Sequence, residues 1–421
     1  MSFIRPFRAL RPAADLVSSI AELPYDVMDT QEARELIKKN PLSFIRVTKA
    51  EATLPENIPD GDPRIYEAAK KNLEEYINKG QLKQDARPCY YIYRQQMGQY
   101  IQIGLVAAAS VEEYKKNIIK KHELTRVDKE TDRVNHIMAT KAQTGPVFLA
   151  YRSKGLLNAL LLKYMSNHPP VYDFTSDDDI KHTLYVVDDP VRIGEITEIF
   201  QQVPQLYIAD GHHRSAAALR VAEELSKRPN QTGQEEYNSF LAVIFPDHML
   251  HILPYNRVVA DLNGLSVADF FKAVDKKFTI DLQEHDPDPK QVHTFGMYVA
   301  GRWFTLTPRA GIYNADDPID SLDVSILQNN LLTPLLGIKD PRTDKRINFV
   351  GGIKGTKKLE ELVDEGKGAV AFAMYPTSMN QLMAVADKGL IMPPKSTWFE
   401  PKLRDAMTIH LIGDEQDGKS V

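Results

Sequence analysis

The sequence predicts a mixed α/β fold, and three observations support this. Short apolar, β-prone runs such as Leu206 to Ala209 alternate with segments whose apolar residues recur at helical spacing. Two pairs of β-rich runs are joined by short links, which is typical of hairpins. The length of 421 residues is enough to bury a large core and to form two or three domains.

The composition is that of a soluble globular protein. Apolar residues make up 43% and charged residues 26% of the chain, which argues against extensive disorder. The net charge of −5 shows no basic excess, so direct nucleic-acid binding is disfavoured. Cys89 is the only cysteine, which excludes an intrachain disulfide and a Cys-based zinc site and indicates a reducing compartment. No apolar run is long enough to span a membrane, so we expect a cytoplasmic protein.

The N-terminal part reads as strands, helices and one hairpin in order. A capping-box pattern at Asp29 to Glu32 predicts a helix start. The other expected elements are a strand at Phe3 to Leu10, a strand at Leu42 to Thr48, an exposed loop at 51 to 63, a helix from Arg64 to Asn78, and a hairpin formed by Cys89 to Arg94 and Tyr100 to Ala109.

A domain boundary is expected near Asp261, which gives a region at 1–260 and a C-terminal α/β domain at 261–421. Before the boundary we expect a strand at Leu184 to Val187, a helix before Leu206, and paired strands at Phe240 to Phe245 and Leu250 to Leu253. After it we expect helices at Ser266 to Phe278, Asp323 to Leu332 and Thr356 to Glu365, a hairpin of Thr294 to Ala300 with Arg302 to Thr307, strands at Arg346 to Val350 and Ala369 to Tyr375, and a capping box at Ser378 to Gln381.

The stretch from Pro204 to Ala216 predicts a strand, a tight turn and a helix. Gly211 lets the backbone turn sharply, and the following helix begins with free N–H groups and a positive dipole end. His212, His213 and Arg214 crowd that end, which is unfavourable unless an anion such as a phosphate is bound there. The alternative is a surface turn with solvated histidines and an arginine paired with a carboxylate.

A second polar cluster lies between Lys121 and Arg133, where a loop leads into a helix. It offers acid, base and hydroxyl groups, which are His122, Glu123, Thr125, Asp132 and Arg133. Val134, Ile137 and Met138 form one face of the helix, so Asp132, Arg133 and His136 are expected near the opposite surface. A solvated charged helix face is the alternative interpretation.

Two further segments are compatible with an anion. Gly351 to Gly355 precedes a helix but lacks the Walker ending, so simple turn geometry is the favoured interpretation. The proline-stiffened loop from Met392 to Lys402 could clamp phosphate oxygens with Lys395, Ser396, Thr397 and Lys402. A structural loop capped by its own hydroxyls is the alternative.

The segment Asp210-Gly211-His212-His213-Arg214 with the alanine-rich helix behind it resembles the phosphate-binding segment of the ParB and sulfiredoxin superfamily, and most of all its free serine kinase branch. Over nearly the whole chain, the sequence resembles a ParB-like family of unknown function found in bacteria and archaea. This second resemblance rests on Pro24 to Val27, His122 to Thr125, Asp132-Arg133, Arg346 to Gly352 and Met392 to Lys402.

The resemblance implies a ParB/sulfiredoxin-like core in which Gly211 to Arg214 bind nucleotide phosphates. The sulfiredoxin branch has a cysteine within the corresponding motif, whereas this chain has His212 and His213 there and Cys89 far away in the sequence. Reductase chemistry of that kind is therefore disfavoured.

The leading functional hypothesis is a kinase that uses ATP or ADP with Mg²⁺ to phosphorylate a small hydroxyl-bearing metabolite, with free serine as the first candidate. Phosphoryl transfer requires charge neutralisation, positioning, and a base or metal ligand. The turn amides, His212, His213 and Arg214 could neutralise phosphates. Asp210 could hold magnesium or orient the acceptor, and Glu123 is a candidate base, although the roles of these two carboxylates could be exchanged. His213 is included among the catalytic candidates.

The alternatives are a noncatalytic ParB-like nucleotide switch and a phosphate-ester hydrolase. The sequence leaves the nucleotide open among ATP, ADP and CTP, and a homodimer remains an option. All hypotheses share one geometric expectation. His122, Glu123, Asp132 and Arg133 should approach the Asp210 to Arg214 turn, and Lys395, Ser396 or Lys402 should border the same cleft.

Overall fold

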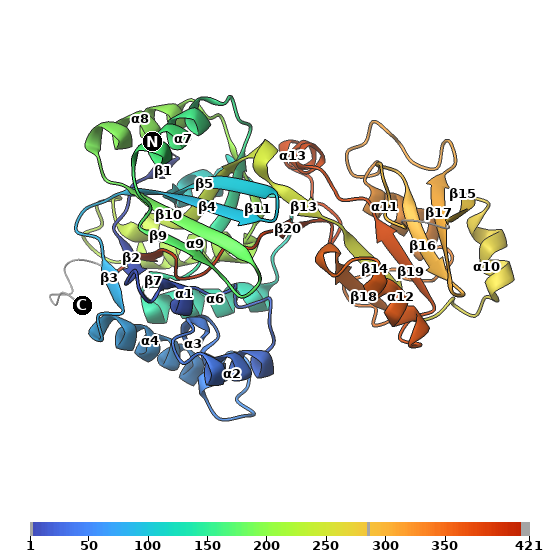
Figure 1. The fold of residues 1–421 in the computed structure, drawn as a ribbon, viewed down its shortest axis with the longest axis horizontal. Coiled ribbons are helices and arrows are strands. Elements are labelled where there is room, and N and C mark those ends of the chain that lie inside the picture. The colour runs from blue at the N-terminus through green and yellow to red at the C-terminus, as the bar shows by residue number, and fades with distance from the viewer. Residues whose placement is uncertain (1–2, 284–286, 414–421) are drawn as a thin grey trace. The chain divides into compact units, whose positions relative to one another are not determined.

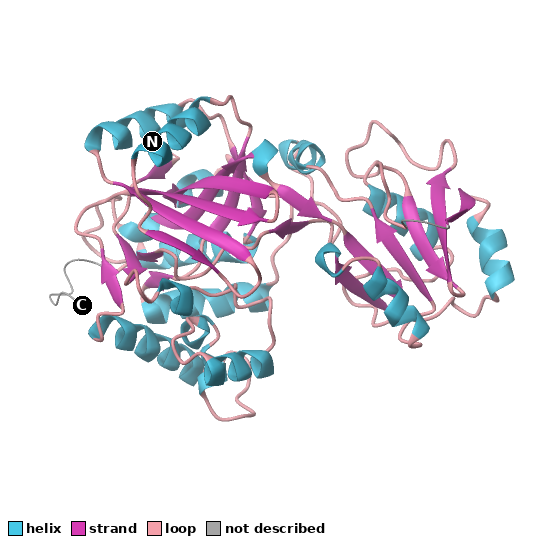
Figure 2. Ribbon diagram, viewed as in Figure 1, coloured by secondary structure: helices cyan, strands magenta, loops and turns pink. Residues whose placement is uncertain are grey.

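The structure is a computed structural model, and it describes residues 3–283 and 287–413. Strands and helices are interspersed along the chain and form a mixed α/β fold, as the sequence predicts (Figures 1 and 2). None of the helices in the described ranges is long and apolar enough to cross a membrane.

The chain divides into two units. Unit 1 contains residues 1–250 and 401–421, and unit 2 contains residues 251–400. This division differs from the expected boundary at 260/261 because strand pairing assigns the flanking segments. Strand β14 (Tyr255–Val259) pairs with strands of unit 2, while β21 (Ile409–Leu411) pairs with strands of unit 1.

Unit 1 is built around a nine-stranded mixed sheet. Strand β11, which leads into the Asp210 turn, lies between β6 and β8 and is buried along its first four residues. It runs parallel to β6 and antiparallel to β8. In order across the sheet, the strands are β6 (Ile119–Lys120), β11 (Leu206–Asp210), β8 (Val147–Tyr151), β12 (Ser239–Pro246), β5 (Tyr100–Ser110), β4 (Tyr90–Met97), β10 (Ile180–Val187) and β9 (Tyr172–Thr175), with β1 (Ile4–Arg5) pairing with β5.

A second sheet of unit 1 joins distant parts of the sequence. Its order is β3 (Leu82–Gln84), β2 (Ala9–Pro12), β21 and β7 (Ala142–Gln143). Because β21 lies between β2 and β7, the C-terminal segment is an integral part of unit 1.

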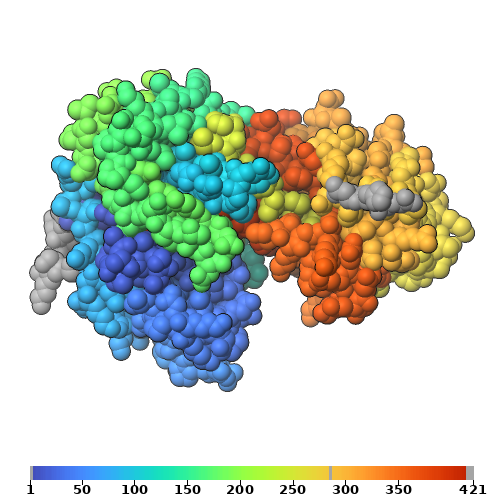
Figure 3. Space-filling view, viewed as in Figure 1, coloured from blue at the N-terminus to red at the C-terminus, as the bar shows by residue number. Residues whose placement is uncertain are grey.

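The helices of unit 1 are α1 (Val17–Ile20), α2 (Thr30–Lys39), α3 (Ile45–Thr48), α4 (Pro63–Asn78), α5 (Val111–Lys115), α6 (Val127–Thr140), α7 (Leu156–Asn167), α8 (Pro190–Gln201) and α9 (His212–Leu225). Apolar residues of α7, α8 and α9 share one core with the strands of the large sheet. In the ribbon and space-filling views, α7 and α8 (green) lie above the sheet of this unit, and α2 and α4 (blue) lie below it (Figures 1 and 3).

Unit 2 contains a six-stranded sheet. Its strand order is β15 (Phe278–Gln283), β17 (Arg302–Pro308), β16 (Phe295–Val299), β19 (Val370–Met374), β14 and β18 (Ile347–Gly351). Its helices are α10 (Val267–Val274), α11 (Asp323–Leu327), α12 (Lys357–Asp364) and α13 (Met379–Asp387), and β13 (His251–Leu253) pairs with β20 (Trp398–Glu400).

Several local predictions are confirmed. Asp29 and Glu32 form a capping box at α2, and Ser378 and Gln381 form one at α13. Both expected hairpins are present, as β4 with β5 and β16 with β17. The expected helix at Asp323 to Leu332 is present as α11 followed by a π-helical turn at Gln328–Leu332.

The strand expected at Leu42 to Thr48 is wrong, because this segment ends in helix α3. The β-branched residues of this segment favour a strand, but its tertiary contacts stabilise a helix. Tyr76 Oη of α4 donates to the carbonyls of Leu42 and Ser43, and Asn72 donates to that of Arg46. These carbonyls are therefore satisfied by helix side chains instead of a neighbouring strand.

Two other strand predictions also need correction. Phe3 to Leu10 is divided between β1, which pairs with β5, and β2, which pairs with β3 and β21. The strands near 240–253 do not pair with each other. Strand β12 lies between β5 and β8, and β13 pairs with β20.

The close packing of β5 on β12 gives a test of the sheet. A Cβ at Gly104 would lie 2.7 Å from Val243 Cγ1 and 2.8 Å from Phe245 Cε1. We expect Gly104→Ala to lower the free energy of unfolding by about 1–3 kcal/mol through overpacking. Urea unfolding followed by far-UV circular dichroism measures this, because both tryptophans, Trp303 and Trp398, lie in unit 2.

The matched control is Gly194→Ala in α8, where a Cβ meets nothing within 4 Å. This change should raise stability by about 0.5–1 kcal/mol, because alanine is the better helix former. Equal effects of the two substitutions would contradict the packing described for β5.

Candidate functional site

The candidate site lies at the beginning of α9, where the backbone turns at Gly211. Gly211 has φ +94°, and a Cβ there would lie 3.4 Å from Val147 Cα, so a side chain would strain the turn. The N-cap residue is Gly211, so no N-cap side chain bonds to the first turn of α9. The first amides of a helix have no partner within the helix and point out from its N-terminal end.

The two histidines of the turn hold the loop that precedes α6. The backbone N–H of His122 donates to His212 Nε2 at 3.5 Å, and the backbone N–H of Arg126 donates to His213 Nε2 at 3.1 Å. Both Nε2 atoms are acceptors in these bonds, which assigns the ring proton of each neutral histidine to Nδ1.

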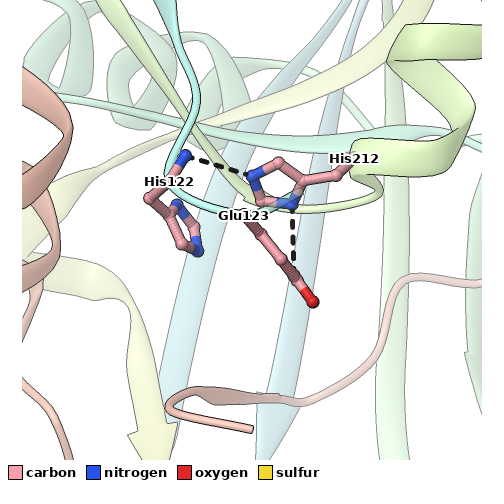
Figure 4. Close-up of side chains that lie close together, drawn as sticks. All are labelled: His122, Glu123 and His212. Atoms are coloured by element: carbon pink, nitrogen blue, oxygen red, sulfur yellow. Dashed lines mark hydrogen bonds and ion pairs between the residues drawn. The ribbon is translucent and has the colours of Figure 1, made fainter. Parts of the chain in front are cut away.

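His122, Glu123 and His212 come together at this point (Figure 4). One ligand atom from each residue lies within 4.8 Å of those of the other two. His212 Nδ1 is 3.5 Å from Glu123 Oε2, and the rings of His122 and His212 meet edge to face with centroids 4.5 Å apart. Both histidines are buried, whereas the Glu123 side chain is 53% exposed.

Burial keeps all three histidines of the site neutral near pH 7. It lowers the pKa of His122 to about 4, although Asp210 acts in the opposite direction. Burial and the neighbouring His122 lower the pKa of His212 well below its usual value, and burial also lowers the pKa of His213.

Asp210 forms an ion pair with Lys402. Its Oδ2 accepts from Lys402 Nζ at 2.8 Å, and its Oδ1 accepts the N–H of Gly211 at 2.8 Å. Burial raises the pKa of Asp210, but Lys402 and the Gly211 amide outweigh it, so the pKa is lower than usual. With an ammonium group on one oxygen and an amide on the other, Asp210 does not fit the magnesium ligand expected from the sequence.

Arg214 is part of a buried ion pair behind the turn. Its Nη2 donates to both carboxylate oxygens of Asp405, at 2.9 and 3.1 Å. The side chains of Arg214 and Asp405 are 15% and 1% exposed. Burial raises the pKa of Asp405 to about 6 against the influence of Arg214. Arg214 therefore has a structural partner, as in the alternative interpretation of the turn.

Asp132 and Arg133 are linked to the turn by Tyr25, whose ring contacts both Arg133 and Arg214. Arg133 lies over the Tyr25 ring at 3.8 Å, and Arg214 lies 5.5 Å from the same ring centroid. Arg133 also pairs with Asp132 at 2.6 Å.

The expectation that Arg133 and His136 lie near the surface is wrong, because both are buried. Helix α6 contacts α4 on one side and α9 on the other, so its polar face also faces protein. His136 is satisfied there by the carbonyl of Val47 at 2.9 Å.

The remaining predicted residues have different environments. Thr125 Oγ1 donates to Glu130 at 2.9 Å, which joins the loop to α6. Lys395, Ser396 and Thr397 belong to unit 2. Within unit 2, Lys395 Nζ is 3.4 Å from Tyr255 Oη, and Ser396 Oγ donates to the carbonyl of Pro393 at 2.6 Å. Their contribution to a site on unit 1 stays a prediction.

Sequence reasoning missed three residues that shape the site, namely Tyr25, Gly145 and Asp405. A Cβ at Gly145 would overlap the Asp405 carboxylate and the Arg214 guanidinium, so only glycine leaves room for the ion pair. Arg214 and Asp405 are 191 positions apart, and no local pattern signals their contact.

Comparison with known proteins identifies the family. The family described as "Protein of unknown function (DUF1015)" matches residues 4–325, more than half of the chain, and the chain belongs to it. None of the curated proteins matches the sequence.

Solved structures that match the chain include a conserved hypothetical protein from Pyrococcus furiosus, with 12% identity, a TM-score of 0.34, and coverage of 73% of this chain and 95% of that chain. A mutant free serine kinase in complex with ADP has 11% identity and a TM-score of 0.34, with coverage of 70% and 87%. C-terminally truncated SbnI from Staphylococcus aureus has 11% identity and a TM-score of 0.38, with coverage of 75% and 90%. At these identities and TM-scores, the likeness carries no functional argument.

The Arg214–Asp405 pair predicts a large effect of removing one partner. We expect Asp405→Ala to lower the free energy of unfolding by about 3–5 kcal/mol, because it leaves a guanidinium buried without its carboxylate. Chemical denaturation followed by circular dichroism measures the loss. In the exposed pair Arg87–Asp188, Asp188→Ala should cost less than about 1 kcal/mol. Similar losses in both variants would show that the buried pair has no special role.

Buried neutral histidines predict acid sensitivity of unit 1. The folded pKa values of His122, His136 and His182 are lowered to about 4, 3 and 3, below the usual 6.5. Their stabilising contribution is complete above pH 6.5 and is lost as the pH falls toward these values. The expected loss is about 1.4 kcal/mol per histidine for each pH unit.

Asp405 acts in the opposite direction between pH 6 and 4, because its folded pKa is raised. Three histidines outweigh one carboxyl, so the net stability should fall. Urea midpoints measured by circular dichroism at pH 7, 5.5 and 4.5 test this, and a constant midpoint would refute it.

Proposed function

We propose that the protein is a nucleotide-dependent kinase that phosphorylates a small hydroxyl-bearing metabolite, with the phosphates bound at the start of α9. The observation that carries this proposal is the convergence of three chain segments at Gly211. The uncapped first turn of α9, the His122–Glu123 loop and Lys402 of the C-terminal segment meet there. Free serine is the first acceptor to test, on the basis of the sequence resemblance.

The start of α9 suits a phosphate group. Its first amides lie at the positive end of the helix dipole, and the N-cap residue, Gly211, has no side chain that could bond to them. Lys402 Nζ, 2.8 Å from Asp210, supplies a cation beside the turn. Arg214, which the sequence suggested for this role, pairs with Asp405, which is 1% exposed, whereas the partner of Lys402, Asp210, is 48% exposed. Lys402 is therefore the better candidate for neutralising phosphate charge at the surface of the turn.

Glu123 is the candidate general base. Its carboxylate is 53% exposed and lies 3.5 Å from His212 Nδ1, at the edge of the turn. A carboxylate in this position can accept the proton that an acceptor hydroxyl loses during phosphoryl transfer. His213, which is neutral and bonded to the backbone of Arg126, positions the loop that carries Glu123.

An apolar surface adjoins these polar groups. Leu124 is 65% exposed and Val127 is 77% exposed, and both belong to the segment that carries Glu123. Exposed aliphatic side chains beside a phosphate-binding turn could contact the flat apolar face of a nucleobase.

The test measures phosphoryl transfer with purified protein, Mg²⁺, and either ATP or ADP. Serine and a panel of other hydroxyl-bearing metabolites serve as acceptors, and ³¹P NMR identifies the products. We expect Glu123→Gln to lower kcat about 10²- to 10⁴-fold, which is the range for loss of a general base.

The matched control is Glu67→Gln, which changes an exposed glutamate on α4 and should leave the rate unchanged. The proposal fails if the wild-type protein transfers no phosphate to any acceptor, or if Glu123→Gln retains the full rate. Calorimetry with the same nucleotides separates a noncatalytic nucleotide switch, which would bind without turnover.

A phosphate-ester hydrolase is the second candidate. The gathering of His122, Glu123 and His212 favours it, because two histidines and a glutamate form a common ligand set in metal-dependent hydrolases. Product analysis distinguishes the two, since a hydrolase releases inorganic phosphate with or without an acceptor.

A further inference from the structure

We propose that His122, Glu123 and His212 bind a divalent transition-metal ion such as zinc or cobalt. This proposal goes beyond phosphoryl transfer and does not depend on it. It also places the metal on residues other than Asp210, the metal ligand expected from the sequence.

The three side chains already approach the separations of a metal site. In a tetrahedral site with bonds of about 2.1 Å, neighbouring ligand atoms are about 3.4 Å apart. His212 Nδ1 and Glu123 Oε2 are 3.5 Å apart, and all three ligand atoms lie within 4.8 Å of one another. A change of at most about 1.4 Å in the separations, through movement of the His122 ring or the exposed Glu123 side chain, would complete the geometry.

The donor atoms select the class of metal. Imidazole nitrogens suit zinc, cobalt, nickel, copper and iron, whereas magnesium and calcium prefer sites made of oxygen. Two histidines with one carboxylate leave coordination positions open on the exposed side of Glu123. Such an open site resembles catalytic zinc sites more than closed structural ones.

His122 provides an independent indication of a ligand. Its side chain is 3% exposed, and its Nδ1 has no hydrogen-bond partner among the described residues. Buried polar atoms in native proteins nearly always have a partner. Figure 4 shows the His122 ring beside the side chains of Glu123 and His212, where a bound cation would satisfy it.

The charges around the site are of both signs, because Lys121 and Lys402 lie near it as well as Asp210. The Asp210 carboxylate lies close enough to both rings to oppose the lowering of their pKa values. It can therefore act as a nearby negative charge without being a ligand. Lys402 offsets part of that charge, which leaves Glu123 as the charged ligand.

Binding requires one local change. His212 Nε2 accepts the N–H of His122 at 3.5 Å, which assigns the ring proton to Nδ1. Coordination through Nδ1 moves this proton to Nε2 or releases it, and the long contact with the His122 amide then opens. Metal binding is also weaker at low pH, because the imidazoles and the carboxylate bind a metal only when they are deprotonated.

The experiment uses the full chain, free of any affinity tag and stripped with a chelator. Titration with ZnCl₂ is followed by calorimetry, and titration with CoCl₂ is followed by visible absorption. We expect one ion per chain, and cobalt bands without the sulfur-to-metal charge transfer that Cys89 would produce. A large excess of MgCl₂ should not displace the ion.

Glu123→Gln and His248→Gln are the decisive variants. Glu123 is exposed, so Glu123→Gln should fold normally, and it should weaken zinc binding at least tenfold. His248 is exposed and lies in a different part of unit 1, so His248→Gln should bind zinc as the wild type does. His212→Gln should also lose binding.

The proposal is overturned if no ion binds at one per chain, if Glu123→Gln binds zinc as tightly as wild type, or if magnesium competes on equal terms. Because binding is measured without nucleotide, these outcomes are independent of the kinase assay. A protein that binds zinc and transfers no phosphate would support this proposal and overturn the proposed function.

Discussion

The buried ion pair between Arg214 and Asp405 holds the site together. It joins the first turn of α9 to the C-terminal segment, and it forms only because Gly145 leaves space beside both groups. The same C-terminal segment carries Lys402, whose ammonium group pairs with Asp210 at the end of β11. Two adjacent ion pairs therefore fix the turn between β11 and α9 in place.

Around this turn, the polar residues divide into those that support it and those that face outward. Arg214, Arg133 and Tyr25 form its support, with the two guanidinium groups on one aromatic ring. His213 holds the backbone of the preceding loop. Glu123 is the side chain that combines exposure with a position next to His212, which is why both the kinase and the metal proposals depend on it.

The two proposals use the same side chains in different ways. As a carboxylate without a metal, Glu123 can accept a proton from a substrate hydroxyl. As a metal ligand, it would instead hold an ion whose bound water or phosphate oxygen is the reactive group. Which of these applies depends on whether His212 keeps its contacts with the His122 backbone and with Glu123 or coordinates a cation together with His122.

The sequence by itself determined the local elements whose signals are short in range. The capping boxes at Asp29 and Ser378, the two hairpins and the strand, turn and helix around Gly211 all follow from residues within a few positions of one another. The polar character of the His122 and Asp210 clusters was also evident from the sequence.

Only the tertiary structure decided which hydrogen-bond and ion-pair partners these segments find. The segment ending at Thr48 became helical because α4 supplies its hydrogen-bond partners, and Arg133 became buried because α6 lies between two helices. The sequence left open whether Arg214 binds an anion or pairs with a carboxylate. In the structure it pairs with Asp405, which is 191 positions away. A buried charge pairs with the opposite charge that the fold brings within a few ångströms of it. The distance between the two groups cannot be read from their separation along the sequence.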